Sequence, residues 1–429
     1  MGSLKGVNIQ RGALGANVSG NNDAISGLLA TGIAVEANVA AGISGIALKQ
    51  TVKLTSLADA AAYGITEAYD STNHLSVYRH VSEFYRKAGE GTPLYLMLYS
   101  GNMEAAFADD VAKQFIIDAE GSIRQLAISN TPTAAMVEEM TYLNSLPADV
   151  FASIQLGQQL YEWAFSTFRP CQIIVEGRDF NAVNAASALD LRAISISGQT
   201  LSAYKVSLCI GQDWKAADEL DAIRKKRADV GTMLGCIAAK AVNENIAEVE
   251  GGSLVDAVNN IWLVAGLSNH QTIAGWDSQL ESLDTKGYIF PITYTGISGY
   301  FWNNDHTCTP IVQDKDGYFN EYTISYGRTH DKVVRLLRVC LLPKVKSTQP
   351  VDPKTGLLPK SLVTYFEKLA DGDVFDKMAA AGEITDGKTT VDENSNLLIV
   401  PRELKVSFVC VPTGQIDEIK GFINLKTSI

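Results

Sequence analysis

The chain contains one sequence pattern that could bind a phosphate. Residues 382–389 match G-x-x-x-x-G-K-[ST], the pattern of a phosphate-binding loop. Such a loop works when a strand precedes it and a helix follows it, because the helix N-terminus then aims backbone amides at the phosphate. Here a helical pattern precedes the match, a strand-like run follows it, and Glu383 and Asp386 would repel a phosphate. We therefore predict a connecting turn at these residues and no nucleotide site.

The histidines and the remaining motifs indicate no other chemistry. His74 and His80 fall on different faces of one predicted helix, and His306 belongs to a polar turn whose side chains bond to the backbone. Asp314 and Asp316 resemble part of a calcium loop, but the further ligands are missing, so we expect a hairpin turn. Neither G-x-S-x-G nor G-x-G-x-x-G occurs. We predict no catalytic, cofactor-binding or metal site.

Composition excludes several classes of function. The 429 residues carry a net charge of -12, which is not the basic footprint of a nucleic-acid-binding protein. No apolar run approaches the ~18 residues of a transmembrane helix, and no secretory signal is visible at the start. The six cysteines are scattered without a C-x-x-C pair, so we expect reduced core thiols and no zinc. A length of this kind predicts two or three domains.

A stretch at residues 299–343 is unusual in this acidic chain. It is predicted to form a strand, a polar turn, a second strand region and a helix that begins near Gly327 and ends before Pro343. One face of the helix is apolar. A second face carries a cationic stripe, formed by Arg328, Lys332, Arg335 and Arg338. The stripe is either a solvated face or a docking surface.

The middle of the chain alternates apolar strands with amphipathic helices. Strands are predicted at residues 94–99, 123–129, 171–175 and 205–210, and helices at residues 75–87, 105–118, 149–168 and 228–246. Short, fully apolar strands separated by helices are typical of a parallel sheet that is covered on both faces. We therefore predict an α/β fold, an open and largely parallel sheet with flanking helices.

Beyond residue 286 the pattern changes to aromatic and β-branched runs, a helix that starts at Pro359, and a strand at residues 403–411. This pattern predicts a smaller C-terminal α+β domain, and both chain ends read as extended arms. The predicted division is an N-terminal arm at 1–20, an α/β body at 21–285, a C-terminal domain at 286–412 and a C-terminal arm at 413–429.

Three short motifs in this order resemble one known family. The first is LTSLADAAAYG at residues 54–64, and the second is VSEFYRKAGEGTPLYLML at residues 81–98. The third is the Asn304-Asp305-His306-Thr307 turn followed by Tyr326-Gly327-Arg328. Together they resemble the contractile tail sheath proteins of myophages, R-type bacteriocins and phage-like injection particles. His306 stands where that family usually has arginine.

The resemblance implies a structural protein that needs no cofactor. Sheath subunits form six-membered rings stacked around an inner tube, and contraction of the lattice drives the tube through a target envelope. The implied partners are further copies of the chain, the inner tail tube protein, and baseplate and tail terminator proteins, with no nucleic acid and no membrane insertion. Synthesis and assembly would take place in the bacterial cytoplasm.

The resemblance also implies roles for particular residues. The arms would add strands to the sheets of neighbouring subunits, through Val7, Asn8, Ile9, Gln10, Gly421, Phe422, Ile423, Asn424 and Leu425. The cationic stripe would face the tube or an adjacent subunit, and residues 65–285 would form the outer body. The alternatives are an α/β enzyme whose active site is assembled only in three dimensions, and a subunit of another helical polymer or shell.

Overall fold

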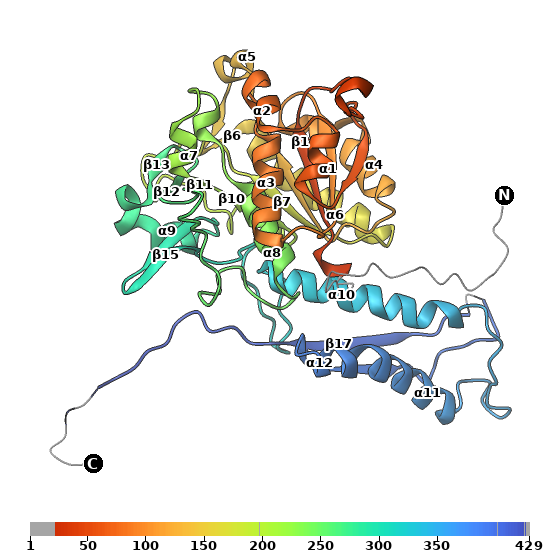
Figure 1. The fold of residues 1–429 in the computed structure, drawn as a ribbon. Coiled ribbons are helices and arrows are strands. Elements are labelled where there is room, and N and C mark those ends of the chain that lie inside the picture. The colour runs from red at the N-terminus through yellow and green to blue at the C-terminus, as the bar shows by residue number, and fades with distance from the viewer. Residues whose placement is uncertain (1–21, 197, 401, 424, 426–429) are drawn as a thin grey trace.

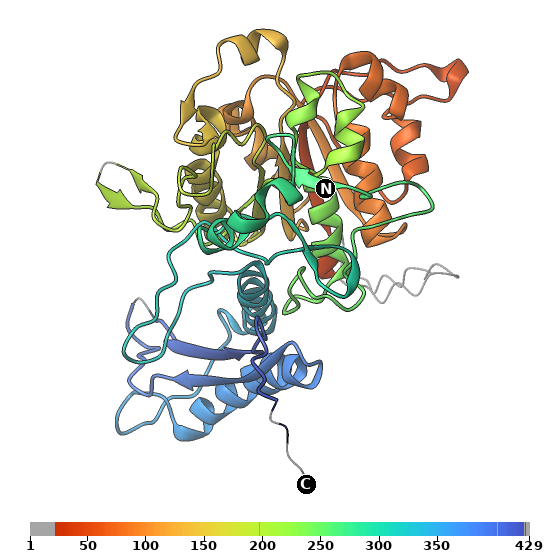
Figure 2. The same ribbon diagram turned by 90° about the vertical axis from the view of Figure 1, so that its left-hand side faces the viewer.

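The computed structural model describes residues 22–196, 198–400, 402–423 and 425. A large α/β body lies on one side of a long helix, and a small two-stranded layer lies on the other side (Figure 1). Beyond β17 (Val406–Pro412) the chain first lines the body at residues 413–419 and then extends away from both parts (Figures 1 and 2). The predicted α/β class, with a smaller C-terminal α+β part, is confirmed. The predicted domain boundaries stay a prediction.

The body is built on a six-stranded sheet with the order β10-β7-β4-β1-β3-β2. Five strands are parallel, and β2 is an antiparallel edge strand. The parallel strands therefore follow the order 2-1-3-4-5 of a doubly wound sheet, in which the winding changes direction beside β1. The strands are β1 (Ser26–Thr31), β2 (Thr51–Leu54), β3 (Leu94–Tyr99), β4 (Gln125–Ser129), β7 (Gln172–Glu176) and β10 (Val206–Cys209).

Helices cover both faces of the sheet (Figures 1 and 2). Because parallel crossovers are right-handed, the connections on the two sides of β1 lie on opposite faces. On one face α3 packs against α8, and on the other face α4 packs against α6. The body helices of six or more residues are α1 (Leu57–Ala62), α2 (Glu67–Asn73), α3 (Val77–Ala88), α4 (Val111–Asp118), α6 (Ala148–Ser166), α8 (Val230–Ala239) and α9 (Leu280–Thr285).

Short strands between residues 211 and 302 complete the body. The hairpin β14 (Pro291–Tyr294) and β15 (Ile297–Trp302) packs beside a small sheet of β11 (Gly211–Asp213), β12 (Ala265–Leu267) and β13 (Gln271–Thr272). Three tryptophans, Trp262, Trp276 and Trp302, are buried here and join the main hydrophobic core, which continues to Ile324. The body core therefore extends as far as the first turn of the long helix.

The C-terminal unit has its own two small hydrophobic clusters. Its long helix α10 (Ile324–Leu341) lies between the body and the antiparallel pair β16 (Ile384–Val391) and β17 (Val406–Pro412) (Figure 1). Helix α11 (Lys360–Ala370) continues through a π-helical turn at Asp371–Phe375 into α12 (Asp376–Ala380). Helix α10 contributes Val333 and Leu337 to one of the small clusters, so it belongs to both parts of the molecule.

Several predicted elements differ from the structure. The helix predicted at 105–118 starts at Val111, because Asp109 and Asp110 adopt positive φ and break the helical path before it. The helix predicted at 228–246 ends at Ala239. Helix α10 begins at Ile324 rather than near Gly327, because Thr323 accepts a hydrogen bond from the Tyr326 amide and caps it.

The connecting turn predicted at residues 382–389 is wrong. Residues from Ile384 onward form strand β16, which pairs with β17. The β-branched run that ends in Val391 favours a strand, and Gly387 lets the strand pass close to the Phe375 ring, where a Cβ would lie 2.1 Å from a ring carbon. Among the described residues after the match there is no helix, so residues 382–389 lack the geometry of a phosphate-binding loop.

The pair α3 and α8 gives a test of the packing. A Cβ added at Gly231 would lie 2.3 Å from the His80 carbonyl oxygen, and both helices would have to separate. We expect Gly231→Ala to lower the free energy of unfolding by about 1–3 kcal/mol, measured by chemical denaturation. Gly275→Ala is the control, because nothing lies within 4 Å of that added Cβ. Equal stability of the two variants would contradict the close packing.

Candidate functional site

The cationic stripe on α10 faces the protein itself. Arg328 is only 4% exposed, and its guanidinium donates to the carbonyl oxygens of Ala241 (3.0 Å), Lys240 (3.2 Å) and Asp23 (3.4 Å). These carbonyls belong to the end of α8 and to the segment that enters β1. Arg328 therefore ties α10 to two separate parts of the body.

The next two cations of the stripe form a cluster around Asp23. Lys332 Nζ lies 2.7 Å from one carboxylate oxygen of Asp23, and Arg335 Nη2 lies 2.6 Å from the other. Lys332 also pairs with Glu383 at 2.5 Å. Burial alone would raise the pKa of Asp23, but the hydrogen bond from Lys332 and the charge of Arg335 hold it below its usual value. The cluster joins the N-terminal segment, α10 and the start of β16.

Arg338, the fourth member of the stripe, stacks on an aromatic ring. Its guanidinium carbon lies 3.4 Å from the centre of the Phe168 ring, which is a cation–π contact with the loop after α6. All four cations therefore have contacts within the chain. A docking role of Arg328, Lys332, Arg335 and Arg338 toward a tube or an adjacent subunit stays a prediction.

A buried ion pair that the sequence analysis missed also fastens α10 to the body. Lys205, at the entry to β10, is fully buried, and its Nζ lies 2.9 Å from Asp331 and 2.7 Å from the Gly327 carbonyl oxygen. The hydroxyl of Tyr161 on α6 donates to the same Asp331 oxygen at 2.9 Å. Burial opposes ionisation of Asp331, but the charge of Lys205 lowers its pKa to about 2. The sequence feature that could have indicated this ion pair is a lysine placed directly before an apolar strand.

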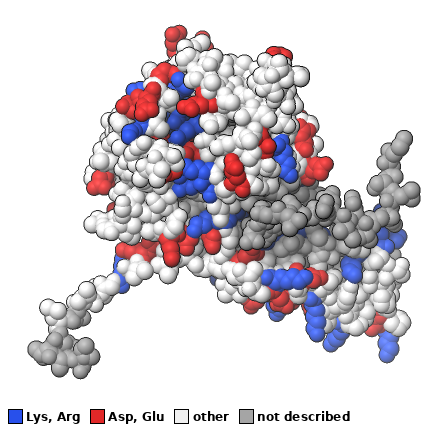
Figure 3. Space-filling model, in the orientation of Figure 1, with Lys and Arg blue, Asp and Glu red and all other residues white. Residues whose placement is uncertain are grey.

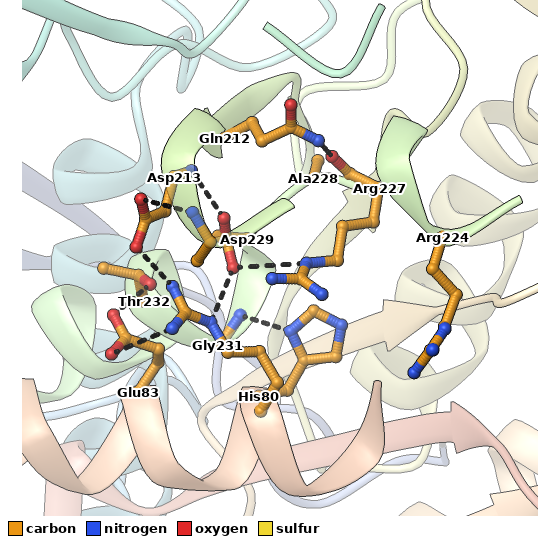
Figure 4. Close-up of polar contacts among 12 residues, drawn as sticks. His80, Glu83, Gln212, Asp213, Arg224, Arg227, Ala228, Asp229, Gly231 and Thr232 are labelled. Atoms are coloured by element: carbon orange, nitrogen blue, oxygen red, sulfur yellow. Dashed lines mark hydrogen bonds and ion pairs between the residues drawn. The ribbon is translucent and has the colours of Figure 1, made fainter. Parts of the chain in front are cut away.

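A second buried ionic cluster lies between α3 and the β11–β12 sheet (Figure 4). Arg79 donates to Asp213 (3.0 Å) and Asp229 (3.2 Å), while Glu83 accepts from Arg86, Thr232 and Trp262. Burial would raise the pKa of Glu83, but the charges of Arg79 and Arg86 lower it to about 2. Each carboxylate of this cluster is held by donors from elements far apart in the chain, so the cluster fixes α3 to residues 211–262.

A serine, a histidine and a glutamate meet at the end of β4. His80 Nδ1 accepts a hydrogen bond from the Gly231 amide (3.4 Å), so in the neutral ring Nε2 carries the proton and donates to Ser129 Oγ (2.9 Å). Ser129 in turn donates to Glu176 (2.7 Å). The ring has no nitrogen left to accept the serine proton, and burial lowers the His80 pKa to about 3. This arrangement does not activate the serine as a nucleophile.

The polar turn at residues 303–307 is held mainly by side chains. His306 Nδ1 accepts from Arg192 (2.9 Å), and its Nε2 lies 2.9 Å from Asp284. Asp305 accepts from the Ser325 amide at the start of α10 (2.9 Å), although burial raises its pKa. The turn thus positions the first residues of α10. The predicted bonds from side chains to the backbone are present for Asn303, Asn304, Asp305 and Thr307, whereas the His306 ring bonds to side chains.

An acidic groove lies at the root of the C-terminal segment. Its volume is about 940 Å³, and residues 413–419 form one wall. The described residues that line it include no lysine, arginine or histidine. Figure 3 shows acidic side chains gathered where this segment leaves the body. The carboxylates of the groove are Glu244, Glu248, Asp277, Glu281, Asp284, Asp417 and Glu418.

The residues proposed for the two arms are only partly described. Val7, Asn8, Ile9, Gln10 and Asn424 lie outside the described residues. Gly421 is exposed, and Phe422, Ile423 and Leu425 are 92%, 93% and 98% exposed. No described residue from 413 to 423 forms a strand, so the strand-like run predicted at 421–425 has no partner within the described chain.

Among the described side chains, no three histidine, cysteine, aspartate or glutamate residues converge as metal ligands would. None of the described helices combines the length and the apolar character needed to cross a membrane.

The fold and these contacts define a doubly wound α/β body to which a second unit is fastened through one long helix. Two family models match the chain: DUF2586, N-terminal domain, over residues 18–306, and DUF2586, C-terminal domain, over residues 322–429. The chain belongs to the DUF2586 family. No curated protein matches it.

One solved structure has the same fold over the full length. It is a chain of the cryo-EM structure of the anti-feeding prophage (AFP) baseplate, 6-fold symmetrised. The two chains are 14% identical, each is covered to 100%, and the TM-score is 0.57. At this identity the likeness concerns the fold.

The pair of Lys205 and Asp331 can be tested directly. We expect Lys205→Met to lower the free energy of unfolding by about 3–5 kcal/mol, because Asp331 is left as a buried, unpaired charge. The double variant Lys205→Met/Asp331→Leu should recover much of this loss. Lys377→Met is the control, since its pair with Asp373 is exposed and is worth at most about 1 kcal/mol. Equal losses in both single variants, measured in denaturant, would contradict the assignment.

His80 predicts a pH dependence. Its folded pKa lies below the ordinary value of 6.5, so below that pH the unfolded chain binds a proton that the folded chain does not. Stability should therefore fall as the pH falls from 6.5, by up to about 1.4 kcal/mol per pH unit from this group. Between pH 6.5 and 4.5, His80→Gln should flatten the dependence, whereas His74→Gln, at an exposed position, should not. If stability depends on pH equally steeply in both variants and in the unchanged protein, the prediction for His80 is wrong.

Proposed function

We propose that this chain is a structural subunit of a phage-like contractile injection system. The observation that carries the proposal is the full-length likeness to a chain of the AFP baseplate structure, because body and C-terminal unit are both included in the match. The sequence motifs at residues 54–64, 81–98 and 304–328 support the same class independently. Under this proposal the chain is an assembly protein rather than an enzyme, and it is made in the bacterial cytoplasm.

Within that class we propose the role of tail sheath subunit. The chain would form stacked six-membered rings around the inner tube, with the tube, baseplate and terminator proteins as further partners. A baseplate subunit is the alternative, because the similar chain belongs to a baseplate structure. The alternative from another class is an α/β enzyme. The hydrogen-bond direction between His80 and Ser129 gives that alternative no support.

The C-terminal segment supports a role in assembly. Its apolar side chains are almost fully exposed, and an exposed apolar row of this kind marks a surface that another chain covers. Strands β16 and β17 form a sheet of only two strands, which is marginal without further partners. We propose that residues 421–425 of one subunit extend the sheet of a neighbour.

The acidic groove supports a contact for the other arm. Residues 1–21 carry Lys5 and Arg11 and no acidic residue, and Val7 and Ile9 alternate with Asn8 and Gln10. A cationic segment with apolar residues, which the sequence predicts to be extended, complements a groove whose charged lining is acidic. We propose that the N-terminal arm of a neighbouring copy, including Val7, Asn8, Ile9 and Gln10, binds there.

Negative-stain microscopy of the purified full-length protein, alone and with the inner tube protein of the same system, tests these proposals. A sheath subunit forms long striated tubes, a baseplate subunit forms rings that do not stack, and an enzyme remains as small separate particles. The third outcome in both samples would overturn the proposed function.

Removal of residues 416–429 tests the C-terminal arm. The cut spares Thr413 and Gln415, which bond to Asn243 and Ser325, so the fold should persist with an unchanged unfolding curve. We expect assembled particles to drop at least about tenfold, because the contact between subunits is lost. Phe422→Ser should weaken assembly, whereas Val258→Ser, at an equally exposed loop position, should not. Normal assembly of the truncated chain would contradict the role of the arm.

A further inference from the structure

A small basic pocket lies at the carboxyl end of the parallel strands. Its volume is about 60 Å³, and it is lined by the loop after β4, the loop after β7 and the segment 222–227. The Thr131 amide donates to the Thr31 hydroxyl at 2.6 Å, so the loop after β4 is joined to the end of β1. The winding of the sheet changes direction between these two strands, and doubly wound sheets bind their ligands at that place.

Cationic side chains dominate the lining of this pocket. Arg178, Arg224, Lys226 and Arg227 line it together with one carboxylate, Asp179. Three of the cations have close carboxylate partners: Arg178 with Asp149 at 2.6 Å, Arg224 with Asp221 at 2.6 Å, and Lys226 with Asp179 at 2.8 Å.

Arg227 is the exception. It is 7% exposed, its Nε has no hydrogen-bond partner, and its nearest carboxylate oxygen, on Asp229, lies at 3.8 Å. That oxygen already accepts a hydrogen bond from Arg79. A buried Nε–H group without a hydrogen bond is costly, and burial lowers the pKa of Arg227. An anion in the pocket would supply the missing acceptor.

We propose that this pocket binds one small tetrahedral oxyanion of the phosphate or sulfate class, with Arg227 as its main ligand. The planar guanidinium suits two oxygens of such an anion, and Asn130 and Thr131 also line the pocket. The volume is far below the ~300–1,000 Å³ of sites that enclose a drug-sized ligand, so the pocket encloses the oxyanion and not a base or a sugar.

The bound anion would link three loops that follow different strands. Arg178 follows β7, Thr131 follows β4, and Arg227 precedes α8. The bound anion would therefore stiffen the carboxyl end of the parallel strands. Through Arg227 the site lies next to Asp229 of the buried ionic cluster. This inference does not depend on the proposed assembly function.

The test is equilibrium dialysis of inorganic phosphate against the full-length protein at constant ionic strength in chloride. We expect saturable binding of one phosphate per chain with a Kd of about 1 mM or tighter, and competition by sulfate. Arg227→Gln should weaken binding at least about tenfold. Lys225→Gln is the matched control, because Lys225 precedes Lys226 but pairs with Asp218 outside the pocket.

Arg224→Gln, at a less buried lining residue, decides the question if Arg227→Gln does not fold. It should also weaken phosphate binding, while Arg227→Lys should retain part of it. Adenosine monophosphate distinguishes the source: tighter binding than inorganic phosphate indicates the terminal phosphate of a larger ligand, and equal or weaker binding indicates the free ion. Absence of saturable phosphate binding up to about 10 mM, or unchanged binding in both arginine variants, would overturn the proposal.

Discussion

The buried pair of Lys205 and Asp331 determines how the two parts of this chain fit together. Two charges without solvent are tolerated only when both are fully hydrogen-bonded, and here the partners come from the edge of the sheet, from α6 and from α10. The pair therefore sets one position of α10 along the body. Arg328 and the cluster around Asp23 hold the same helix at further points. The small two-stranded unit is placed by this helix and by the hydrogen bonds of Asn243 to Gly382 and Thr413.

Much of the fold follows from residue patterns that a single sequence displays. Strands β3, β4, β7 and β10 are buried on both faces and appear as apolar runs, so their positions were predictable within a few residues. The ends of helices were less predictable, because they depend on single groups such as the Thr323 cap or the positive φ of Asp109. The segment 382–389 was misassigned because its pairing partner, β17, and the Phe375 ring that accepts Gly387 are supplied only by the folded chain.

The contacts of the cationic stripe were outside the reach of sequence reasoning. Helical spacing shows that Arg328, Lys332 and Arg335 share a face, but it does not show what that face meets. Their partners, Asp23 and the end of α8, are distant in the chain and carry no pattern of their own. Likewise, the pocket around Arg227 arises only where three loops converge. A lysine directly before an apolar strand, such as Lys205, places a charge where the sequence predicts burial. Such a position does indicate a buried ion pair.

Asp23 also has a mechanical meaning. It lies directly before β1, the strand with neighbours on both sides in the middle of the sheet, and it is clamped by Lys332 and Arg335. A pull on the first residues of the chain is therefore resisted at Asp23, where it divides between α10 and the central strand. The load therefore enters a strand that is paired on both sides and a helix that contacts both parts of the molecule.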